Sequence, residues 1–313
     1  MKKNILITGG NGFLGKGLAI KFKKKYNVFL GSRNNKNNFE AEKLTGCKSV
    51  PLDVSNYNSL NDAIEYTKPE ILIHAAATKF VGWSETYPFE CCDINILGSS
   101  NVARCSIDKK VKTVIGISTD KATQPIKNFY GMSKAVMEKL FYLANKKSKT
   151  NFLTVRYGNV AWSTGSVLPL WRDMFTKNKV IETTGPFMRR FFFTIEDAIN
   201  LVDIALKNQN YLSGKTLCPE MKSSRMIDII QNWNKLYGGS YKIIKGREGD
   251  RQDEYLISEN ELNFCEKKKY NGKNYFVLDF NKKTKKPIKK IISSKTSKKL
   301  SNKEIIKLIK NNF

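Results

Sequence analysis

The feature that most constrains the fold is a glycine-rich loop directly after the first apolar run of the chain. The sequence "NILITGGNGFLGKGLA" spaces Gly9, Gly12 and Gly15 as Gly-x-x-Gly-x-x-Gly, between that run and a segment of helical periodicity. In a strand–loop–helix unit, such glycines permit a tight turn, let backbone N–H groups approach a pyrophosphate, and allow close helix–strand packing. The loop therefore predicts a dinucleotide-binding unit, with Phe13 and Leu14 at the cofactor side of the helix.

The remainder of the first half alternates apolar runs of strand length with helical segments. The expected strands after the first are "NVFLGS" (27–32), "KSVPLDV" (48–54), "EILIHAAA" (70–77), "KTVIGIST" (112–119) and "NFLTVRYG" (151–158). The expected helices are Gly12–Lys25, Ser59–Thr67, Glu90–Ser106 and Tyr130–Asn145. This alternation is typical of βαβ units. The fold class expected is α/β, a Rossmann-like doubly wound parallel sheet with a smaller C-terminal α/β substrate-binding lobe.

The second half has a looser rhythm. Helices are expected at "EDAINLVDIALK" (196–207) and "SRMIDIIQNWNKLYG" (224–238), and short strands at "GKTLCP", "SYKIIKG" and "YFVLDF". We expect a dinucleotide-binding domain over residues 1–165, to which residues of about 190–215 return, and a substrate-binding lobe over 166–265. Residues 266–313 are expected to form a lysine-rich tail with a final helix, where Ser301 and Glu304 have capping-box spacing.

Composition limits the partners and the compartment. The 313 residues carry a formal charge of +27, but the lysines are scattered and no nucleic-acid-binding motif is present, so nucleic acid is an unlikely partner. No apolar run approaches the ~20 residues that span a bilayer, so we expect no membrane segment. Six cysteines without a Cys-x-x-Cys pair and a single histidine, His74, argue against a metal site and favour a reducing, cytoplasmic setting.

The ends of the second and third strands bear on the cofactor. An NAD site usually places an acidic residue after the second strand, where this chain has Ser32 and Arg33. A hydroxyl and a guanidinium suit a 2′-phosphate, so NADP is favoured and NAD stays possible. Asp53 and Val54, at the end of the third strand, are candidates to hold the adenine.

The stretch "ISTDKATQPIKNFYGMSK" is the candidate reacting centre. Tyr130 and Lys134 are four residues apart and therefore share one helix face. A nearby ammonium lowers the pKa of a phenol, which then accepts a proton from a substrate hydroxyl while hydride leaves the same carbon. Thr119, at the carboxyl end of the fifth strand, is expected to hydrogen-bond that hydroxyl.

With these motifs the chain resembles the extended short-chain dehydrogenases/reductases. Among them it is similar to the nucleotide-sugar 4,6-dehydratases, in particular the UDP-N-acetylglucosamine 4,6-dehydratase group of polysaccharide biosynthesis. The stretches that carry the resemblance span roughly residues 4–258: "ITGGNGFLG", "HAAATKFV", "INILGSSNV", "STDKA", "YGMSK", "RYGNV", "GSVLP", "MRRFFFTIEDA" and, weakly, "REGDRQDE". The discriminating piece is "STDKA", because ordinary epimerases of the superfamily lack the Asp-Lys pair.

The resemblance implies an NADP-dependent reaction on a nucleotide sugar, most simply UDP-N-acetylglucosamine. Oxidation at C4 acidifies the C5 proton, water leaves across C5–C6, and hydride returns to C6. The resemblance implies that Lys121 is the C5 base and Asp120 the acid for the departing hydroxyl. Two adjacent opposite charges shift one another's pKa, so the residues alone do not assign the proton.

Further roles are also implied by the resemblance. Ala75, Ala76 and Lys79 are expected near the cofactor, and the substrate-binding candidates are Lys79, Asn159, Arg190 and Arg247. The chain is expected to be a homo-oligomer, as related proteins are.

Two other functions stay open. One is a 4-epimerase or 4-reductase on the same scaffold, which needs Thr119, Tyr130 and Lys134 but not Asp120 or Lys121. The other is a non-catalytic dinucleotide-sensing or nucleic-acid-associated protein. The chain also departs from the dehydratase pattern: an extra residue precedes Tyr130, and Thr164 and Arg189 stand where arginine and threonine are common.

Overall fold

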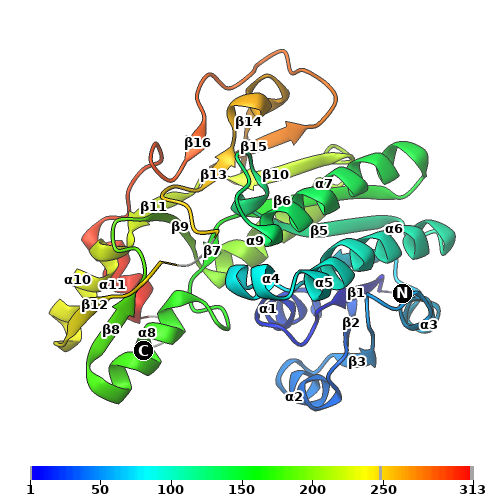
Figure 1. Cartoon of the computed structure of the whole chain (residues 1–313). Coiled ribbons are helices and arrows are strands. Elements are labelled where there is room, and N and C mark those ends of the chain that lie inside the picture. The colour runs from blue at the N-terminus through cyan, green and yellow to red at the C-terminus, as the bar shows by residue number, and fades with distance from the viewer. Residues whose placement is uncertain (1, 247–248, 311–313) are drawn as a thin grey trace.

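A parallel sheet built from the first half of the chain forms the centre of the molecule (Figure 1). The computed structural model describes residues 2–246 and 249–310. The six predicted strands form as β1 (Asn4–Thr8), β2 (Asn27–Ser32), β3 (Lys48–Pro51), β4 (Ile71–His74), β5 (Thr113–Thr119) and β6 (Asn151–Tyr157). They pair in parallel in the order β6-β5-β4-β1-β2-β3, so the predicted doubly wound Rossmann-like sheet is confirmed.

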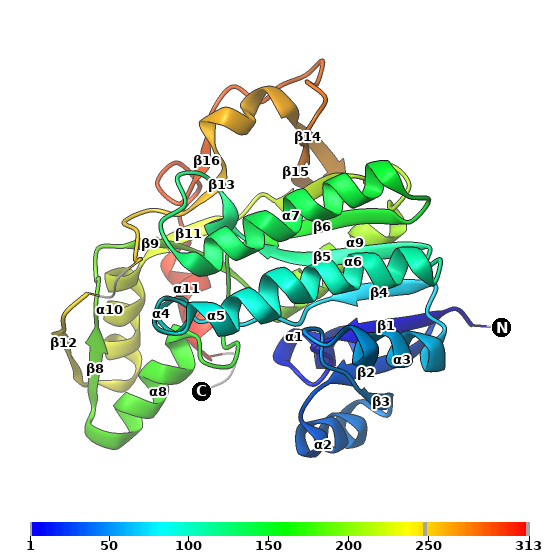
Figure 2. The ribbon, with the colours of Figure 1, turned by 45° about the vertical axis from the view of Figure 1, so that its right-hand side comes forward.

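Helices cover both faces of this sheet, which explains why its strands are continuously apolar. Alternate residues of one strand face opposite layers: Ile5 and Ile7 lie in the core with α1 (Phe13–Phe22) and α9 (Ile195–Lys207). Leu6 lies in the core with α3 (Tyr57–Thr67), α6 (Gly98–Asp108) and α7 (Phe129–Lys147). Figure 2 shows α6 and α7 running side by side along β5 and β6.

Several helices differ from expectation. The segment expected as a helix over Glu90–Ser106 begins within α5 (Pro88–Cys91), which follows the unexpected α4 (Val81–Thr86), and then has a wider π-helical stretch, η1 (Cys92–Leu97), before α6. α2 (Asn35–Thr45) was not expected, because its sequence has few apolar residues at helical spacing. Its ends explain why it forms: Asn34 Oδ1 accepts from Asn37 N, and Gly46 ends the helix in the left-handed region.

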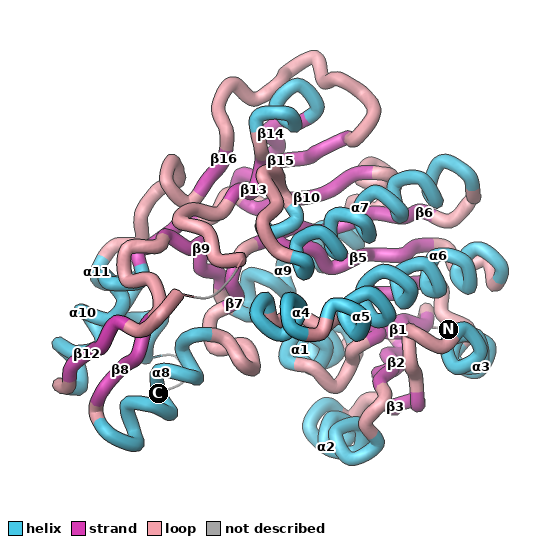
Figure 3. Tube along the Cα trace, in the orientation of Figure 1, coloured by secondary structure: helices cyan, strands magenta, loops and turns pink. Residues whose placement is uncertain are grey.

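A smaller lobe lies beyond the carboxyl ends of the strands (Figure 3). It contains α8 (Val167–Asn178), α10 (Met226–Tyr237) and α11 (Asn302–Lys310), together with the parallel pair β8 (Val180–Thr183) and β12 (Ser240–Ile243). A three-stranded sheet of β7 (Asn159–Val160), β9 (Arg189–Phe193) and β11 (Lys222–Arg225) joins it to the main domain. Its core is aromatic, centred on Trp171 and Trp233.

Residues expected to form a lysine-rich tail are instead largely part of the folded domains. β14 (Cys265–Tyr270) and β15 (Lys273–Asp279) form a hairpin, and β15 pairs antiparallel with β10 (Lys215–Pro219), which extends the main sheet to nine strands within the described residues. β13 (Tyr255–Ile257) pairs with β16 (Ile292–Ser293). The lysines of β14 obscured this arrangement in the sequence: Lys267 and Lys269 are exposed, and Cys265 alone among the residues of this strand is buried.

The final helix was predicted over 301–312, and α11 occupies 302–310 of it. Ser301 and Glu304 form the expected capping box: Ser301 N donates to Glu304 Oε2 at 2.9 Å, and Glu304 N donates to Ser301 Oγ at 3.4 Å. Ile305, Leu308 and Ile309 are buried in the aromatic core of the smaller lobe.

Candidate active site

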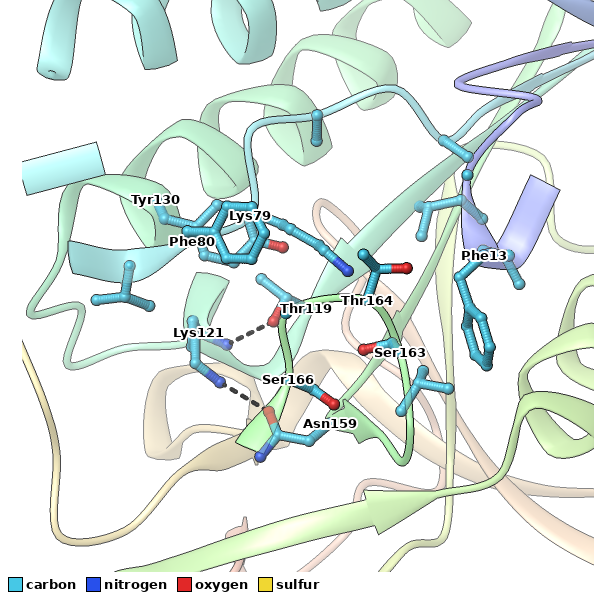
Figure 4. Close-up of a pocket in the computed structure, with 18 of the residues that line it drawn as sticks. Phe13, Lys79, Phe80, Thr119, Lys121, Tyr130, Asn159, Ser163, Thr164 and Ser166 are labelled. Carbon is cyan, nitrogen blue, oxygen red and sulfur yellow. Dashed lines mark hydrogen bonds between the residues drawn. The ribbon is translucent and has the colours of Figure 1, made fainter. Parts of the chain in front are cut away.

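A cavity of about 670 Å³ lies where the carboxyl ends of β1, β4, β5 and β6 meet the smaller lobe. This is the position at which open α/β sheets bind ligands. On the sheet side its wall contains Gly9, residues 12–15 and the Ala75–Ala76 pair, as the glycine loop predicts. Six of the predicted catalytic or substrate-binding residues also line it: Thr119, Lys121, Tyr130, Lys134, Lys79 and Asn159. Figure 4 labels all of these except Lys134.

The glycine loop has no room for side chains. Gly9 has φ +67°, and a Cβ there lies 2.8 Å from the backbone nitrogen of Ala76. A Cβ on Gly15 lies 2.5 Å from the carbonyl oxygen of Gly10. Gly12 stands at the N-cap of α1 without a side-chain cap, so the first N–H groups of that helix stay available to an anion. These residues fit a dinucleotide pyrophosphate.

The residues expected to select the cofactor lie beside the cavity and not in its wall. Ser32 ends β2 and Arg33 follows it, while Asp53 and Val54 come after β3, the parallel neighbour of β2. The Ser32 hydroxyl donates to Asn38 Oδ1, whereas Arg33 is exposed. Asp53 Oδ1 accepts from the backbone N and the hydroxyl of the same serine two residues on, at 2.9 and 2.7 Å.

Tyr130 and Lys134 lie on the first turns of α7, where Asn128 Oδ1 accepts from Gly131 N at 2.8 Å and caps the helix. Burial raises the pKa of Tyr130 to about 12, although Lys121 and a hydrogen bond with Thr119 act in the opposite direction. Burial lowers the pKa of Lys134 to about 8, and its Nζ lies 3.2 Å from the sulfur of a methionine one turn on. The expected lowering of the tyrosine pKa by Lys134 is therefore wrong for this structure, because burial dominates and the opposing cation is Lys121.

Asp120 and Lys121 form an ion pair with Nζ 3.1 Å from Oδ1, at the point where β5 passes into a short 3-10 turn, η2 (Asp120–Ala122). Asp120 Oδ1 also accepts from the Thr119 hydroxyl at 3.0 Å. Lys121 reaches the cavity wall and donates to Asn159 Oδ1 at 3.4 Å, whereas Asp120 is fully buried. Asp120 Oδ2 has no hydrogen-bond partner within the described residues.

The protonation of this pair follows from burial and neighbouring charges. Burial raises the pKa of Asp120, and the nearby Glu254 adds to this effect, while Lys121 opposes it. For Lys121, burial favours the neutral amine, but Asp120 and Glu254 outweigh it and raise the pKa. The resting pair is thus an ammonium beside a carboxylate that is unusually easy to protonate.

Glu254 and Arg251 complete the charge cluster and were not among the predicted site residues. Glu254 Oε1 lies 3.5 Å from Lys121 Nζ, and Arg251 Nη2 lies 2.7 Å from Glu254 Oε2. Arg251 also donates to the carbonyl oxygens of Thr123 and Pro125, at 3.2 and 2.7 Å. Both residues belong to the charged stretch "REGDRQDE", but the spacing of charges along a loop does not show which side chains become buried.

The predicted substrate-binding residues lie in different places. Lys79 extends its ammonium into the cavity towards Thr164, and burial lowers its pKa (Figure 4). Arg190 is buried behind the cavity wall, with Nε 3.8 Å from Glu254 Oε1 and Nη1 donating to the carbonyl oxygen of Arg189 at 2.9 Å. Arg247 lies outside the described residues. Ser163 and Ser166, from the loop before α8, also line the cavity and were not anticipated.

The sequence matches the family described as polysaccharide biosynthesis protein over residues 5–277. The chain belongs to this family. It is 35% identical over 274 residues to a UDP-glucose 4-epimerase of Rickettsia bellii, which covers 83% of this chain and 79% of the relative. It is 32% identical over 288 residues to an inverting UDP-N-acetylglucosamine 4,6-dehydratase of Campylobacter jejuni, covering 88% of this chain and 83% of that one. The resemblance to the extended short-chain dehydrogenase/reductase and dehydratase group is therefore confirmed.

Among solved structures, the chain resembles the X-ray structure of Pen from Bacillus thuringiensis. The TM-score is 0.90 at 30% sequence identity, and the match covers 99% of this chain and 97% of that chain. The similarity therefore extends through the smaller lobe and beyond β15. Within residues 2–246 and 249–310, no helix has the length and apolarity needed to cross a membrane.

Proposed function

We propose that the protein is an NADP-dependent nucleotide-sugar 4,6-dehydratase that acts on UDP-N-acetylglucosamine in polysaccharide biosynthesis. The observation that carries the proposal is the Asp120–Lys121 ion pair, which presents an amine to the same cavity as Tyr130. An enzyme that only moves hydride at C4 needs one proton-transfer group. A second pair of acid and base groups beside the first is what removal of water requires.

The residues divide the reaction between them. Tyr130 takes the proton of the C4 hydroxyl, with Thr119 orienting that hydroxyl. When bound, the nicotinamide supplies the acceptor for hydride from C4 and later its donor to C6. The resulting C4 ketone acidifies the C5 proton, and elimination then needs a base at C5 and an acid at the C6 hydroxyl.

Asp120 and Lys121 supply both groups through a single proton transfer. If the Lys121 ammonium passes a proton along the 3.1 Å contact to Asp120, the pair becomes a neutral amine and a carboxylic acid. The amine removes the C5 proton, and the acid protonates the C6 hydroxyl as it leaves as water. When hydride adds to C6, a solvent-exchangeable proton is returned to C5. Burial of Asp120 supports this exchange because it raises the pKa of that carboxyl. Asp120 itself lies behind the wall, so its proton reaches the cavity through Lys121 or Thr119.

The proposed cofactor is NADP. The glycine loop and the uncapped start of α1 accommodate the pyrophosphate. Arg33, exposed after β2, is the cation that a 2′-phosphate would meet. Ser32 contributes less, because its hydroxyl proton is already donated to Asn38. Asp53 and Val54 are proposed to border the adenine.

The proposed substrate contacts begin with Lys79 and Asn159 at the cavity wall. Arg190 and Arg247 are proposed as further substrate contacts. Arg190 lies behind the cavity wall, and Arg247 lies outside the described residues. The diphosphate requires cations, and Lys79 has no carboxylate partner within the described residues, so its ammonium is available to a phosphate oxygen.

The second candidate function is a nucleotide-sugar 4-epimerase, which the similarity to the Rickettsia bellii protein favours. An epimerase uses Thr119, Tyr130 and Lys134 and has no need of the Asp120–Lys121 pair. The dehydratase and the epimerase therefore differ in how much activity remains when Lys121 is replaced.

The test is product analysis of the purified protein by mass and NMR, with a panel of UDP-, dTDP-, GDP- and CDP-hexoses in deuterated water. The dehydratase gives a 4-keto-6-deoxy product with deuterium at C5 and no net reduced cofactor. In a Lys121→Ala variant the dehydratase stalls after C4 oxidation, whereas an epimerase keeps most of its activity. Lys127→Ala, an exposed lysine on the same loop, is the matched control. Absence of 4,6-product from every sugar would overturn the proposal.

We also propose a cytoplasmic homo-oligomer. Apolar side chains gather on the outer surface of the helices from α5 to α7: Phe89 is 84% exposed, and Leu97, Met132, Val136 and Leu143 are each more than 40% exposed. A surface of this kind is typical of an interface between subunits. Light scattering after gel filtration measures the oligomeric state, and a monomer at micromolar concentration would contradict the proposed homo-oligomer.

A further inference from the structure

Glu254 is a buried carboxylate to which the proposed reaction gives no role. It is 2% exposed and lies directly behind Lys121. Its Oε1 is 3.5 Å from Lys121 Nζ and 3.8 Å from Arg190 Nε, and its Oε2 is 2.7 Å from Arg251 Nη2. A carboxylate so deeply buried costs free energy unless cations surround it, and two arginines do so here.

The backbone at Glu254 is held from a distant part of the chain. Glu254 N donates to Ser294 Oγ at 3.0 Å, and Ser294 N donates to Glu254 O at 2.8 Å. Ser294 is fully buried and follows β16, which pairs with β13 immediately after Glu254. The carboxylate therefore has a fixed position relative to Lys121, as a positioning group requires.

Lys121 lies between two carboxylates. Asp120 Oδ1 approaches it at 3.1 Å from its own turn, and Glu254 Oε1 approaches it at 3.5 Å from the loop before β13. Other groups that face it are the amide oxygen of Asn159, at 3.4 Å from β7, the guanidinium of Arg190 from β9 and the phenol of Tyr130 from α7. Asp250 pairs with Arg190, at 3.9 Å. Of the two carboxylates beside Lys121, only Asp120 serves the reaction as a proton carrier.

We propose that Glu254 is a positioning residue that holds the side chain of Lys121 at the cavity wall. The inference rests on the proposed function, because it assigns the partner of the proposed base. The second carboxylate stabilises the ammonium form. It does not itself exchange protons, because burial raises its pKa but Lys121, Arg190 and Arg251 together outweigh burial and hold the pKa below its ordinary value. Glu254 thereby sets the pH at which Lys121 becomes able to remove the C5 proton.

The test replaces the charge and keeps the shape, with Glu254→Gln. Loss of an anion within 4 Å of an ammonium lowers the pKa of the amine by about 1 unit or more. Glu254 raises the pKa of both Asp120 and Lys121, so its loss moves the acidic limb of kcat/KM against pH, where the pair takes up a second proton, to lower pH by a similar amount. A loss of activity without movement of this limb would overturn the proposal, since a merely structural role predicts that result.

A second measurement does not depend on turnover. Competitive acetylation with trace acetic anhydride, quantified by peptide mass spectrometry at a series of pH values, gives the titration midpoint of Lys121 in the folded protein. We expect a lower midpoint in Glu254→Gln than in the unmodified chain. If no sugar is turned over, the dehydratase proposal fails, but the titration midpoint of Lys121 still tests the role of Glu254. A midpoint that is unchanged in Glu254→Gln would overturn the proposed role of Glu254.

Glu261→Gln is the matched control, because Glu261 also belongs to a largely buried ion pair, with Arg156 Nη1 at 2.9 Å, and does not contact Lys121. It is expected to leave the midpoint of Lys121 in place, and an equal shift in both variants would contradict the specific role. Should Glu254→Gln fail to fold, Glu254→Asp keeps the charge beside Arg251 and withdraws it from Lys121 by one methylene. A smaller shift in the same direction is then expected, and no shift would count against the proposal.

Discussion

Lys121 and Asp120 are neighbours in the chain and lie 3.1 Å apart through Nζ and Oδ1, yet only Lys121 reaches the cavity. The turn that follows β5 directs one side chain outward and buries the other completely. Asp120 cannot touch the substrate, but it is ion-paired with Lys121, which can. Its simplest role is therefore to hold a proton that Lys121 gives up. The predictions on Asp120 follow from this relationship.

Asp120→Asn should retain oxidation at C4 and lose elimination. The amide keeps the shape but can neither accept the Lys121 proton nor deliver one, so we expect kcat for the 4,6-product to fall by about 10²–10⁴-fold. Single-turnover absorbance of the reduced cofactor, followed with product analysis, separates the two steps. Equal loss of both steps would show that Asp120 only supports the fold.

Lys134 should make stability depend on pH. Burial lowers its pKa from 10.5 to about 8, so between these values the unfolded chain binds the proton and the folded chain does not. The free energy of unfolding therefore rises with pH through this window, and below about pH 8 the full cost of burying the ammonium is present. Relative to Lys134→Met, the unmodified protein should gain on the order of 2 kcal/mol between about pH 7.5 and pH 10.

Urea unfolding of the two proteins at both pH values measures this difference. Groups other than Lys134 titrate equally in the two chains and cancel in the comparison. A difference that is constant with pH would mean that Lys134 titrates normally in the folded state.

Gly15→Ala should weaken dinucleotide binding. The added Cβ lies 2.5 Å from the carbonyl oxygen of Gly10, so the loop and the start of α1 have to separate. We expect the Kd for the cofactor, measured by calorimetry, to rise by more than about 10-fold, which is 1.4 kcal/mol. Gly246→Ala is the control, because a Cβ there meets no heavy atom of the described residues within 4 Å and its effect on binding should be negligible.

Arg33→Ala tests the cofactor preference. The exposed guanidinium is placed to meet a 2′-phosphate, and one charge-assisted contact contributes about 1.5–3 kcal/mol. The Kd for NADP should therefore rise by roughly 10- to 100-fold, while that for NAD changes little. Comparable weakening of both cofactors would indicate that Arg33 serves the loop and not the phosphate.

The C-terminal helix should contribute to stability, although its sequence looks like a lysine-rich tail. Ile309 is fully buried in the smaller lobe, and Trp162 Nε1 donates to the carbonyl oxygen of Leu308 at 2.7 Å. Ile309→Ala should lower the free energy of unfolding by about 2–5 kcal/mol. The exposed neighbour Lys307→Ala should change it by less than about 0.5 kcal/mol, and equal effects would contradict the packing described.

Local signals predicted the parts of the molecule that depend on neighbours in the chain. The six strands could be predicted because a parallel sheet covered on both faces requires continuous apolar runs, as in "NILIT". The glycine loop could be predicted from the spacing of its glycines directly after the first of these runs. The Tyr130–Lys134 pair was readable because helical spacing fixes which residues share a face. The expected pKa of Tyr130 was wrong because it depends on burial, which spacing does not reveal.

The sequence by itself determined the sheet, the dinucleotide loop and the Thr119–Lys134 stretch, since each arises from residues a few positions apart. Only the tertiary structure decided that Glu254 lies behind Lys121, 133 positions away in the chain, and that Ser294 holds it there. It also decided that Asp120 is hidden and Lys121 exposed to the cavity. The physical reason is that long-range charge contacts follow from how separate segments pack, and a charged residue in a loop carries no local sign of whether it will be buried.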